Sequence, residues 1–233
     1  MGAMTYSGHV DPGGQAALRE LDAVRVHKLS VGPMDNNAYL LTCRASGRSA
    51  LIDAAAEPER ILALLLAATG GTALDLVVTT HRHADHHGAL AEVLARTGAA
   101  HACGAADADA IGAPADRVLR HRDTLDVGRV RLDVVALRGH TPGSVALSYR
   151  EPARTAVPDA VPGRAHLFTG DSLFPGGPGR TAGPPEFRRL MADLDERVFG
   201  SFDDRTWVYP GHGDDTTLGA ERPALPAWRA RGW

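Results

Sequence analysis

The chain has 233 residues, of which 44% are hydrophobic, so it is long enough to bury one sizeable core. A net charge of −3 without blocks of like charge argues against a phosphate-tracking surface, so we expect no nucleic-acid partner. Two cysteines are too few for a disulfide framework, and no stretch approaches the roughly 18 apolar residues of a membrane span. We therefore expect a cytoplasmic protein with no membrane partner, and we assign it no oligomeric state.

The start of the chain lacks the basic-then-apolar order of a signal peptide. We assign residues 1–20 to an N-terminal extension. Within it, Met1 to Ala3 are interpreted as a cloning remnant ahead of a second start at Met4. Residues 21–233 are expected to form one domain.

In the first half of the domain, short apolar runs predict strands and longer periodic runs predict helices. The expected strands are residues 23–31, 37–43, 49–54 and 74–81. Asp35, Asn36 and Asn37 are expected to form the turn between the first two strands. The expected helices are residues 58–71, which open with Pro58, and 85–98, which close on Gly98.

The second half repeats this mixture of strands and helices. The expected strands are residues 99–105, 131–137, 145–149, 166–170 and 206–211, and the expected helix is 184–200. Residues 151–165 are rich in proline and alanine and predict a surface loop. Two sheets with helices on their outer faces, a four-layer αββα sandwich in the α/β class, account for this order in a single domain.

Polar side chains that could bind metal follow several of the predicted buried strands. His81, His140, Asp171 and His212 each stand just beyond an apolar run and beside glycine, proline or threonine. Ligands in α/β sheets gather beyond the carboxyl ends of the strands. We therefore expect these four loops to converge on one cleft.

The stretch "THRHADHH" adds further candidate ligands to this cleft. His81 and His83 are two residues apart, so on an extended segment they point to the same side and can bind one ion. Asp85 and His86 lie where the next helix begins and suit a second ion. With His140 on the first ion, His212 on the second and Asp171 between them, two complete ligand sets result.

Structural roles are the alternative for single members of this set. Asp85 alone would be an ordinary helix N-cap, and a lone histidine is usually structural. A dense run of polar side chains near a core is costly unless something coordinates it, which favours metal. The remaining histidines lack such company and are expected to be structural: His9, His27, His87, His101, His121 and His166.

The run of Thr80, His81, His83, Asp85 and His86 resembles the T-H-x-H-x-D-H signature of the metallo-β-lactamase superfamily. Later motifs of that superfamily follow in order: "RGHTPGS" with His140, "FTGDSLF" with Asp171, and "YPGHGDDTTLGAE" with His212. "ALIDA" matches its early aspartate, so the resemblance implies that Asp53 holds the ligands from behind. The resemblance also implies the αββα fold with a dinuclear cleft at the sheet edges.

Within the superfamily, "GDSLFPGGPGRT" and "PGHGDDTTLGAE" are similar to the glyoxalase II branch, the hydroxyacylglutathione hydrolases. This implies two zinc ions, with one iron or mixed zinc, iron and manganese as alternatives. It also implies hydrolysis of a small thioester by attack of a metal-bridging hydroxide on the carbonyl. Asp85 is the expected catalytic residue, which orients the hydroxide and accepts its proton.

The chain departs from that branch where the branch binds glutathione. We expect no counterpart of the branch's C-terminal helical domain, because the sequence ends about twenty residues after His212, and Arg180 and Thr181 stand in the region of the branch's lysine and tyrosine. The carrier thiol therefore stays open. We expect Arg180 to anchor a substrate carboxylate, with a surface salt bridge as the alternative.

Three other functions remain as alternatives. Persulfide dioxygenases share the fold and use one iron, held by residues that match His81 or His83, His140 and Asp171. A β-lactamase-like hydrolase is less favoured, because those enzymes usually carry cysteine where Asp171 stands. A non-catalytic metal-binding module ranks last, because no ligand of the signature is lost.

Overall fold

The computed structural model describes residues 6–71 and 73–232. The proposed cloning remnant, Met1 to Ala3, lies outside these residues. The helices are α1 (Pro58–Thr69), α2 (Leu90–Thr97), α3 (Pro184–Leu194), α4 (Leu218–Glu221) and α5 (Leu225–Arg231). Shorter helical segments are the 3₁₀ turns η1 (Ala84–His86), η2 (Ala108–Ala110) and η4 (Arg222–Ala224), and the π-helical turn η3 (Asp195–Phe199).

Two large sheets contain most of the strands. The first runs in the order β1 (Ala17–Glu20), β2 (Val24–Val31), β3 (Asn36–Cys43), β4 (Ser49–Ile52), β5 (Leu76–Thr79), β6 (Ala100–Gly104) and β7 (Arg117–Leu119). The second runs β15 (Thr216–Thr217), β14 (Trp207–Pro210), β11 (Ala165–Gly170), β10 (Val145–Arg150), β9 (Val130–Ala136) and β8 (Thr124–Val127). A small hairpin pairs β12 (Leu173–Phe174) with β13 (Gly177–Pro178).

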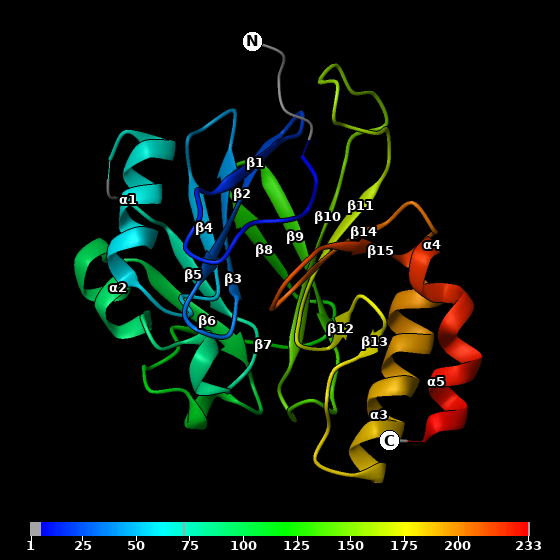
Figure 1. The fold of residues 1–233 in the computed structure, drawn as a ribbon. Coiled ribbons are helices and arrows are strands. Elements are labelled where there is room, and N and C mark those ends of the chain that lie inside the picture. Colours follow the sequence, from blue (N-terminus) through cyan, green and yellow to red (C-terminus); the bar gives the residue numbers. More distant parts are fainter. Residues whose placement is uncertain (1–5, 72, 233) are drawn as a thin grey trace.

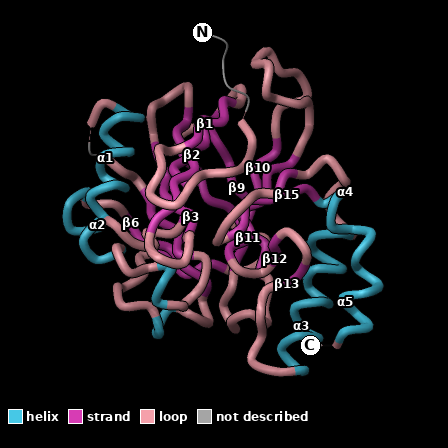
Figure 2. Tube along the Cα trace, in the orientation of Figure 1, coloured by secondary structure: helices cyan, strands magenta, loops and turns pink. Residues whose placement is uncertain are grey.

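The two sheets lie face to face, with α1 and α2 outside the first sheet and α3 and α5 outside the second (Figure 1). Figure 2 shows the same succession of helix, sheet, sheet and helix. The four-layer αββα sandwich expected from the sequence is therefore confirmed. Among the described residues, no helix is long and apolar enough to cross a membrane.

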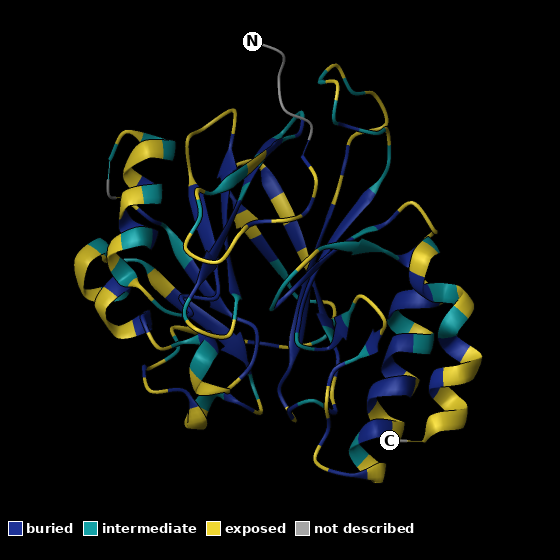
Figure 3. Cartoon of the chain, in the orientation of Figure 1, coloured by how far each residue is buried: buried dark blue, intermediate teal, exposed yellow. Residues whose placement is uncertain are grey.

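Three apolar clusters hold the layers together. Leu41, Phe168 and Tyr209 belong to the cluster between the sheets. Leu65 of α1 packs onto the first sheet, and Leu190 of α3 packs onto the second. Each fully buried side chain of this size contributes about 1.5–3 kcal/mol through removal of apolar surface from water. In Figure 3 the buried colour accordingly predominates in the central strands of both sheets and along α3.

The structure departs from three sequence expectations. Residues 17–20, which we assign to the extension, form β1 and pair with β2, so the sheet includes part of that extension. Asn36 and Asn37 are buried and open β3 rather than forming a turn. The helix expected over 85–98 begins only at Leu90, and the 3₁₀ turn η1 precedes it. Between them the backbone at Gly88 lies so close to Ala55 that a Cβ would stand 2.7 Å from a carbonyl oxygen.

The loop expected over residues 151–165 is present as the connection between β10 and β11. Its base is held by Glu151, which is buried and pairs with His166 at 2.8 Å and Arg164 at 3.3 Å. The loop lies between His140 and Asp171 in the chain, but the hydrogen bonds and ion pairs of its described residues do not involve the candidate ligands.

Backbone hydrogen bonds join the two sheets at one shared edge. Val145 N donates to Thr80 O at 2.9 Å, and Asn37 N donates to Gly211 O at 2.7 Å. Gly211 N donates in turn to Gly170 O at 2.9 Å. The loops that follow β5, β11 and β14 therefore meet at this edge, which is where the candidate ligands lie.

Candidate metal centre

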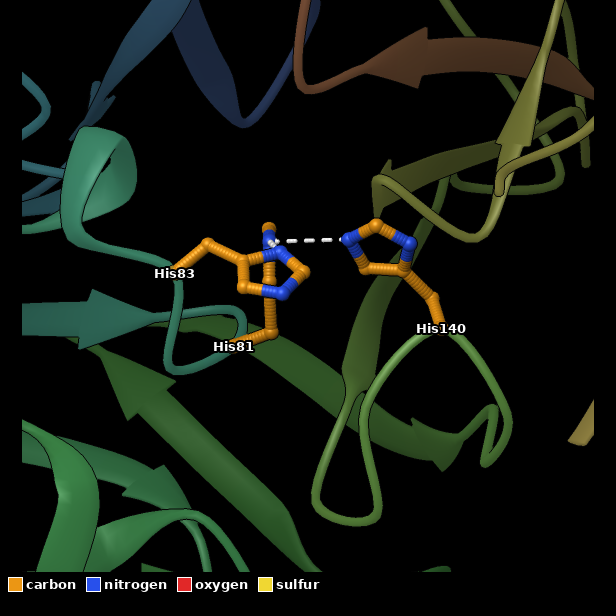
Figure 4. Close-up of side chains that lie close together, drawn as sticks. All are labelled: His81, His83 and His140. Atoms are coloured by element: carbon orange, nitrogen blue, oxygen red, sulfur yellow. Dashed lines mark hydrogen bonds between the residues drawn. The ribbon is translucent and has the colours of Figure 1, made fainter. Parts of the chain in front are cut away.

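The first ligand group consists of His81, His83 and His140, whose ring nitrogens lie within 4.8 Å of one another. His81 Nε2 lies 3.0 Å from His83 Nδ1 and 3.2 Å from His140 Nε2. Figure 4 shows the three rings turned toward one another from the loops after β5 and β9. The pair two residues apart in the sequence thus faces one point, as the extended spacing predicts.

The second group consists of Asp85, His86 and His212. His212 Nε2 lies 3.2 Å from His86 Nε2 and 3.3 Å from Asp85 Oδ2. His86 is fully buried, whereas the side chains of Asp85 and His212 are about one quarter exposed. This second group therefore combines a buried ligand with two that solvent or a substrate can reach.

Asp171 lies between the two groups. Its Oδ2 is 3.6 Å from His140 Nε2 and 3.4 Å from His212 Nε2, and its Oδ1 is 3.2 Å from His86 Nε2. Oδ1 is buried and satisfies no hydrogen bond within the part of the chain that the structure describes. A buried carboxylate oxygen without a donor is costly, and a cation between the groups would remove that cost.

Hydrogen bonds at the far side of three rings decide which nitrogen carries the proton. His140 Nδ1 lies 2.6 Å from Arg180 O, and His212 Nδ1 lies 2.8 Å from Met34 O. His86 Nδ1 lies 2.8 Å from Asp53 Oδ2. Because these oxygens can only accept, Nδ1 donates in each ring, and the neutral ring turns the lone pair of Nε2 toward the centre.

In His81, too, Nδ1 carries the proton, in this case because of its contact with Thr80. The Thr80 hydroxyl donates its one proton to Asp53 Oδ2 at 2.8 Å, so it can only accept from His81 Nδ1 at 3.0 Å. Thr80 N also donates to Asp53 Oδ1 at 2.7 Å. The buried carboxylate of Asp53 thus orients His86 directly and His81 through Thr80, which is the position that the resemblance implies.

These donor atoms fit the coordination chemistry of a divalent ion. Ligand atoms about 2.0–2.1 Å from a tetrahedral ion lie about 3.3–3.4 Å apart, close to the separations within each group. Four imidazole lone pairs that converge without a cation would repel one another. The residues present therefore fit two ions, with Asp171 placed to reach both.

The pKa shifts of the cluster also favour a bound cation. Burial alone would lower the pKa of His86, but the carboxylates of Asp53 and Asp171 outweigh it and raise that pKa to about 10. Burial also opposes ionisation of Asp171, yet His212 and His86 hold the pKa of that carboxyl far below its usual value. Burial lowers the pKa values of His81 and His140. A proton on His86 is thus the alternative to a metal ion.

Asn36 was missed as a site residue in the sequence. Its Nδ2 donates to Asp85 Oδ2 at 2.9 Å and to Asp85 O at 3.0 Å. Burial opposes ionisation of Asp85, but this hydrogen bond and the charge of His86 keep the pKa of the carboxyl below its usual value. The only sequence signal was an asparagine beside an apolar strand, which is equally typical of a turn.

Asp107 was also missed. It is fully buried and accepts from Arg82 N at 3.1 Å, from Gly143 N at 2.8 Å and from the Thr141 hydroxyl. It therefore ties the loop that carries His81 and His83 to the loop that carries His140. No local pattern in the sequence distinguishes this aspartate from its neighbours at 109 and 116.

Arg180 lies beside the centre in a manner that the sequence does not reveal. Its backbone carbonyl accepts from His140, while its side chain is exposed and lines a hollow of about 300 Å³. Two of the histidines expected to be structural have other partners: His101 lies 3.0 Å from Thr79 Oγ1, and His166 pairs with Glu151.

With the geometry established, known proteins provide a comparison. A family model described as the metallo-beta-lactamase superfamily matches residues 31–212, which contain every candidate ligand. The chain belongs to the metallo-β-lactamase superfamily. The family and the fold expected from the sequence are therefore confirmed.

Relatives and solved structures refine this placement within the superfamily. A hydroxyacylglutathione hydrolase of Fuscovulum blasticum is 40% identical over 146 residues, which are 63% of this chain and 51% of that protein. A B3 metallo-β-lactamase, BLEG-1, superposes with a TM-score of 0.73 at 25% identity, covering 86% of this chain and 98% of that one. ETHE1 from Myxococcus xanthus superposes with a TM-score of 0.69 at 28% identity, covering 86% and 83%. The chain spans between about half and two thirds of the curated relatives that it matches.

Proposed function

We propose that this chain is a dinuclear zinc metallohydrolase of the glyoxalase II type that hydrolyses a small thioester. The observation that carries the proposal is the convergence of bare imidazole nitrogens on both sides of Asp171. The hydroxyacylglutathione hydrolases among its relatives support the reaction class. The proposed ligands are His81, His83 and His140 for one ion, and Asp85, His86 and His212 for the other, with Asp171 shared.

Two divalent ions held by these residues would lower the pKa of a coordinated water, so that it could lose a proton at neutral pH, and would act as Lewis acids on the carbonyl oxygen. Asp85 orients that water and takes its proton, because its Oδ2 is fixed by Asn36 at 2.9 Å and its side chain is one quarter exposed. Asp53 acts through Thr80 and His86 and keeps the ligands in the correct tautomer. A thiolate leaves readily, so no separate general acid is required.

A cytoplasmic location stays a prediction.

The first experiment measures metal content per chain by plasma mass spectrometry on protein purified without added metal or a nickel column. About two zinc equivalents, together with turnover of simple acyl thioesters, is the expected result. Asp171→Ala should retain less than one equivalent, whereas a matched change at the surface, Asp126→Ala, whose side chain is 65% exposed, should retain two. Two equivalents in Asp171→Ala would contradict the shared ligand.

A second candidate function has an observation in its favour. His81, His140 and Asp171 alone form a set of two histidines and one carboxylate, with the oxygen Oδ2 at 4.0 Å and 3.6 Å from the two ring nitrogens. Such a set suits one non-haem iron, as in a persulfide dioxygenase. Near one iron per chain with oxygen uptake on a thiol persulfide would establish this function instead of thioester hydrolysis.

A further inference from the structure

The first ion of the proposed centre takes its histidine ligands from both halves of the sandwich. His81 and His83 follow β5 of the first sheet, whereas His140 follows β9 of the second sheet. Figure 4 shows His140 approaching the other two rings from the opposite side, and its Nε2 lies 3.2 Å from His81 Nε2. The position of His140 relative to the first sheet therefore determines whether the three rings can share one ion.

The backbone that leads into His140 is pressed onto helix α3. Gly139 has a φ of 144°, and a Cβ at this residue would clash with Glu186 O and would lie 2.6 Å from Leu190 Cβ. Such a φ favours glycine, and a side chain here would push the loop away from the helix. The ring of His140 is held just before the same helix, because its Nδ1 lies 2.6 Å from Arg180 O. Helix α3 and the residues before it thus support this ligand.

Asp193 of α3 fixes the same backbone from a buried position, since its side chain is only 3% exposed. Its Oδ2 accepts from Arg138 N and Arg138 Nε, both at 2.9 Å, and its Oδ1 accepts from Arg138 Nη2 at 2.7 Å. Oδ1 also lies 3.4 Å from Arg197 Nη2, and Arg197 Nη1 donates to Ala136 O at 2.8 Å. One buried carboxylate therefore holds the chain two residues before a metal ligand.

Asp195 makes a pair of the same geometry that serves a different purpose. It lies two residues further along, and the Arg229 guanidinium donates to it at 2.6 Å and 3.0 Å. This pair joins the end of α3 to α5 and is about half exposed on the arginine side. Comparison of Asp193 with Asp195 therefore separates the effect of holding the loop of His140 from the effect of an ion pair on this part of the chain.

The ligands of the second ion are held by other elements. His212 Nδ1 lies 2.8 Å from Met34 O, and Asp85 Oδ2 accepts from Asn36 Nδ2 at 2.9 Å. Met34 and Asn36 lie where β3 begins, on the first sheet. A change in α3 should therefore affect the first ion and leave the second ion in place.

We propose that Asp193 is a positioning residue for the first metal ion, because together with Arg138 it sets the place of His140. Asp107, from the loop after β6, holds the same loop beyond the ligand and accepts from Gly143 N at 2.8 Å. The ligand thus stands between two buried aspartates, one from each half of the sandwich. The inference rests on the dinuclear centre proposed above and not on the reaction assigned to it.

The test isolates each ion by removing a ligand of the other. His212→Ala keeps the ligands proposed for the first ion, and His140→Ala keeps those proposed for the second. Asp193→Asn is nearly isosteric, but its amide N–H groups would oppose the N–H donors of Arg138 and Arg197. Competition with a chromophoric chelator measures zinc affinity. Asp193→Asn should weaken zinc binding about tenfold in the His212→Ala protein and leave it unchanged in the His140→Ala protein.

Two further variants complete the experiment. Asp195→Asn is the matched control and should leave zinc affinity unchanged in both proteins. Arg138→Gln removes a guanidinium from a side chain that is 45% exposed but keeps the backbone N–H bond to Asp193. It should weaken the first ion by a smaller factor, and it carries the same test if circular dichroism shows that Asp193→Asn does not fold.

The outcomes separate a positioning role from a purely structural one. A variant that only destabilised the fold would weaken zinc binding equally in the His212→Ala and His140→Ala proteins, and this result would overturn the proposal. An unchanged affinity in the His212→Ala protein would overturn it as well. Absence of thioester turnover in wild-type protein, with the difference in zinc affinity intact, would instead overturn only the proposed reaction.

Discussion

Replacement of Asp53 by asparagine should weaken metal binding without unfolding the protein. Asp53 accepts three hydrogen bonds, from Thr80 N at 2.7 Å, Thr80 Oγ1 at 2.8 Å and His86 Nδ1 at 2.8 Å. An amide keeps one acceptor oxygen and turns N–H donors toward the other partners. His86 would then be favoured as the tautomer with its proton on Nε2, which cannot bind metal.

The expected loss of metal affinity follows from the removal of a group that orients a ligand. Removal of a partner that orients a metal ligand typically costs about 10- to 100-fold in metal affinity, or about 1.4–2.7 kcal/mol. The loss should fall mainly on the ion bound by His86 and His212. The altered contacts to Thr80 and His86 should also lower the free energy of unfolding by about 3 kcal/mol, since hydrogen bonds to charged groups contribute about 1.5–3 kcal/mol each.

Competition with a chromophoric zinc chelator measures this effect, and circular dichroism checks the fold. The matched control is Asp75→Asn, because Asp75 also accepts from a backbone N–H, that of Ser49 at 2.8 Å, but lies away from the ligands. The control should bind two zinc ions as tightly as wild-type protein. Two zinc ions bound with unchanged affinity by Asp53→Asn would refute the argument from tautomers.

Three further outcomes are expected. Asp85→Ala should abolish thioester turnover while circular dichroism stays unchanged, and wild-type rates in that variant would contradict a dinuclear hydrolase. Zinc binding near pH 8 should release protons, because the metal replaces the proton on His86, whose pKa is about 10 without metal, and a pH-stat or calorimetry in buffers of different ionisation enthalpy measures them. Burial lowers the pKa of His166 from 6.5 to about 4, so between these pH values the unfolded chain binds more protons than the folded one. The free energy of unfolding should therefore decrease as the pH is lowered from 6.5 to 4, by up to about 3 kcal/mol. His166→Gln should flatten this slope in urea denaturation of chelator-treated protein, and an unchanged slope would assign it to other groups.

The sequence by itself determined the fold class and the candidate ligands, because patterns within short stretches of residues indicate both. Apolar runs with a period of two or of 3.6 predict strands and helices, and His81, His140, Asp171 and His212 each stand just beyond such a run. The spacing of His81 and His83 predicts their common direction on an extended segment, and the structure brings them to 3.0 Å. The motif order then led to the superfamily that the family model confirms.

The tertiary structure alone decided the contacts that orient these ligands. Asp107 joins two loops that lie more than fifty residues apart, and Asn36 reaches Asp85 from another strand, so neither contact has a periodic or local signature. The protonated nitrogen of each ring depends on backbone carbonyls such as Arg180 O, whose position is fixed by folding. The same applies to Asp193, which reaches Arg138 only because α3 packs onto the second sheet. Packing between distant segments determines such contacts, and no short stretch of sequence encodes them.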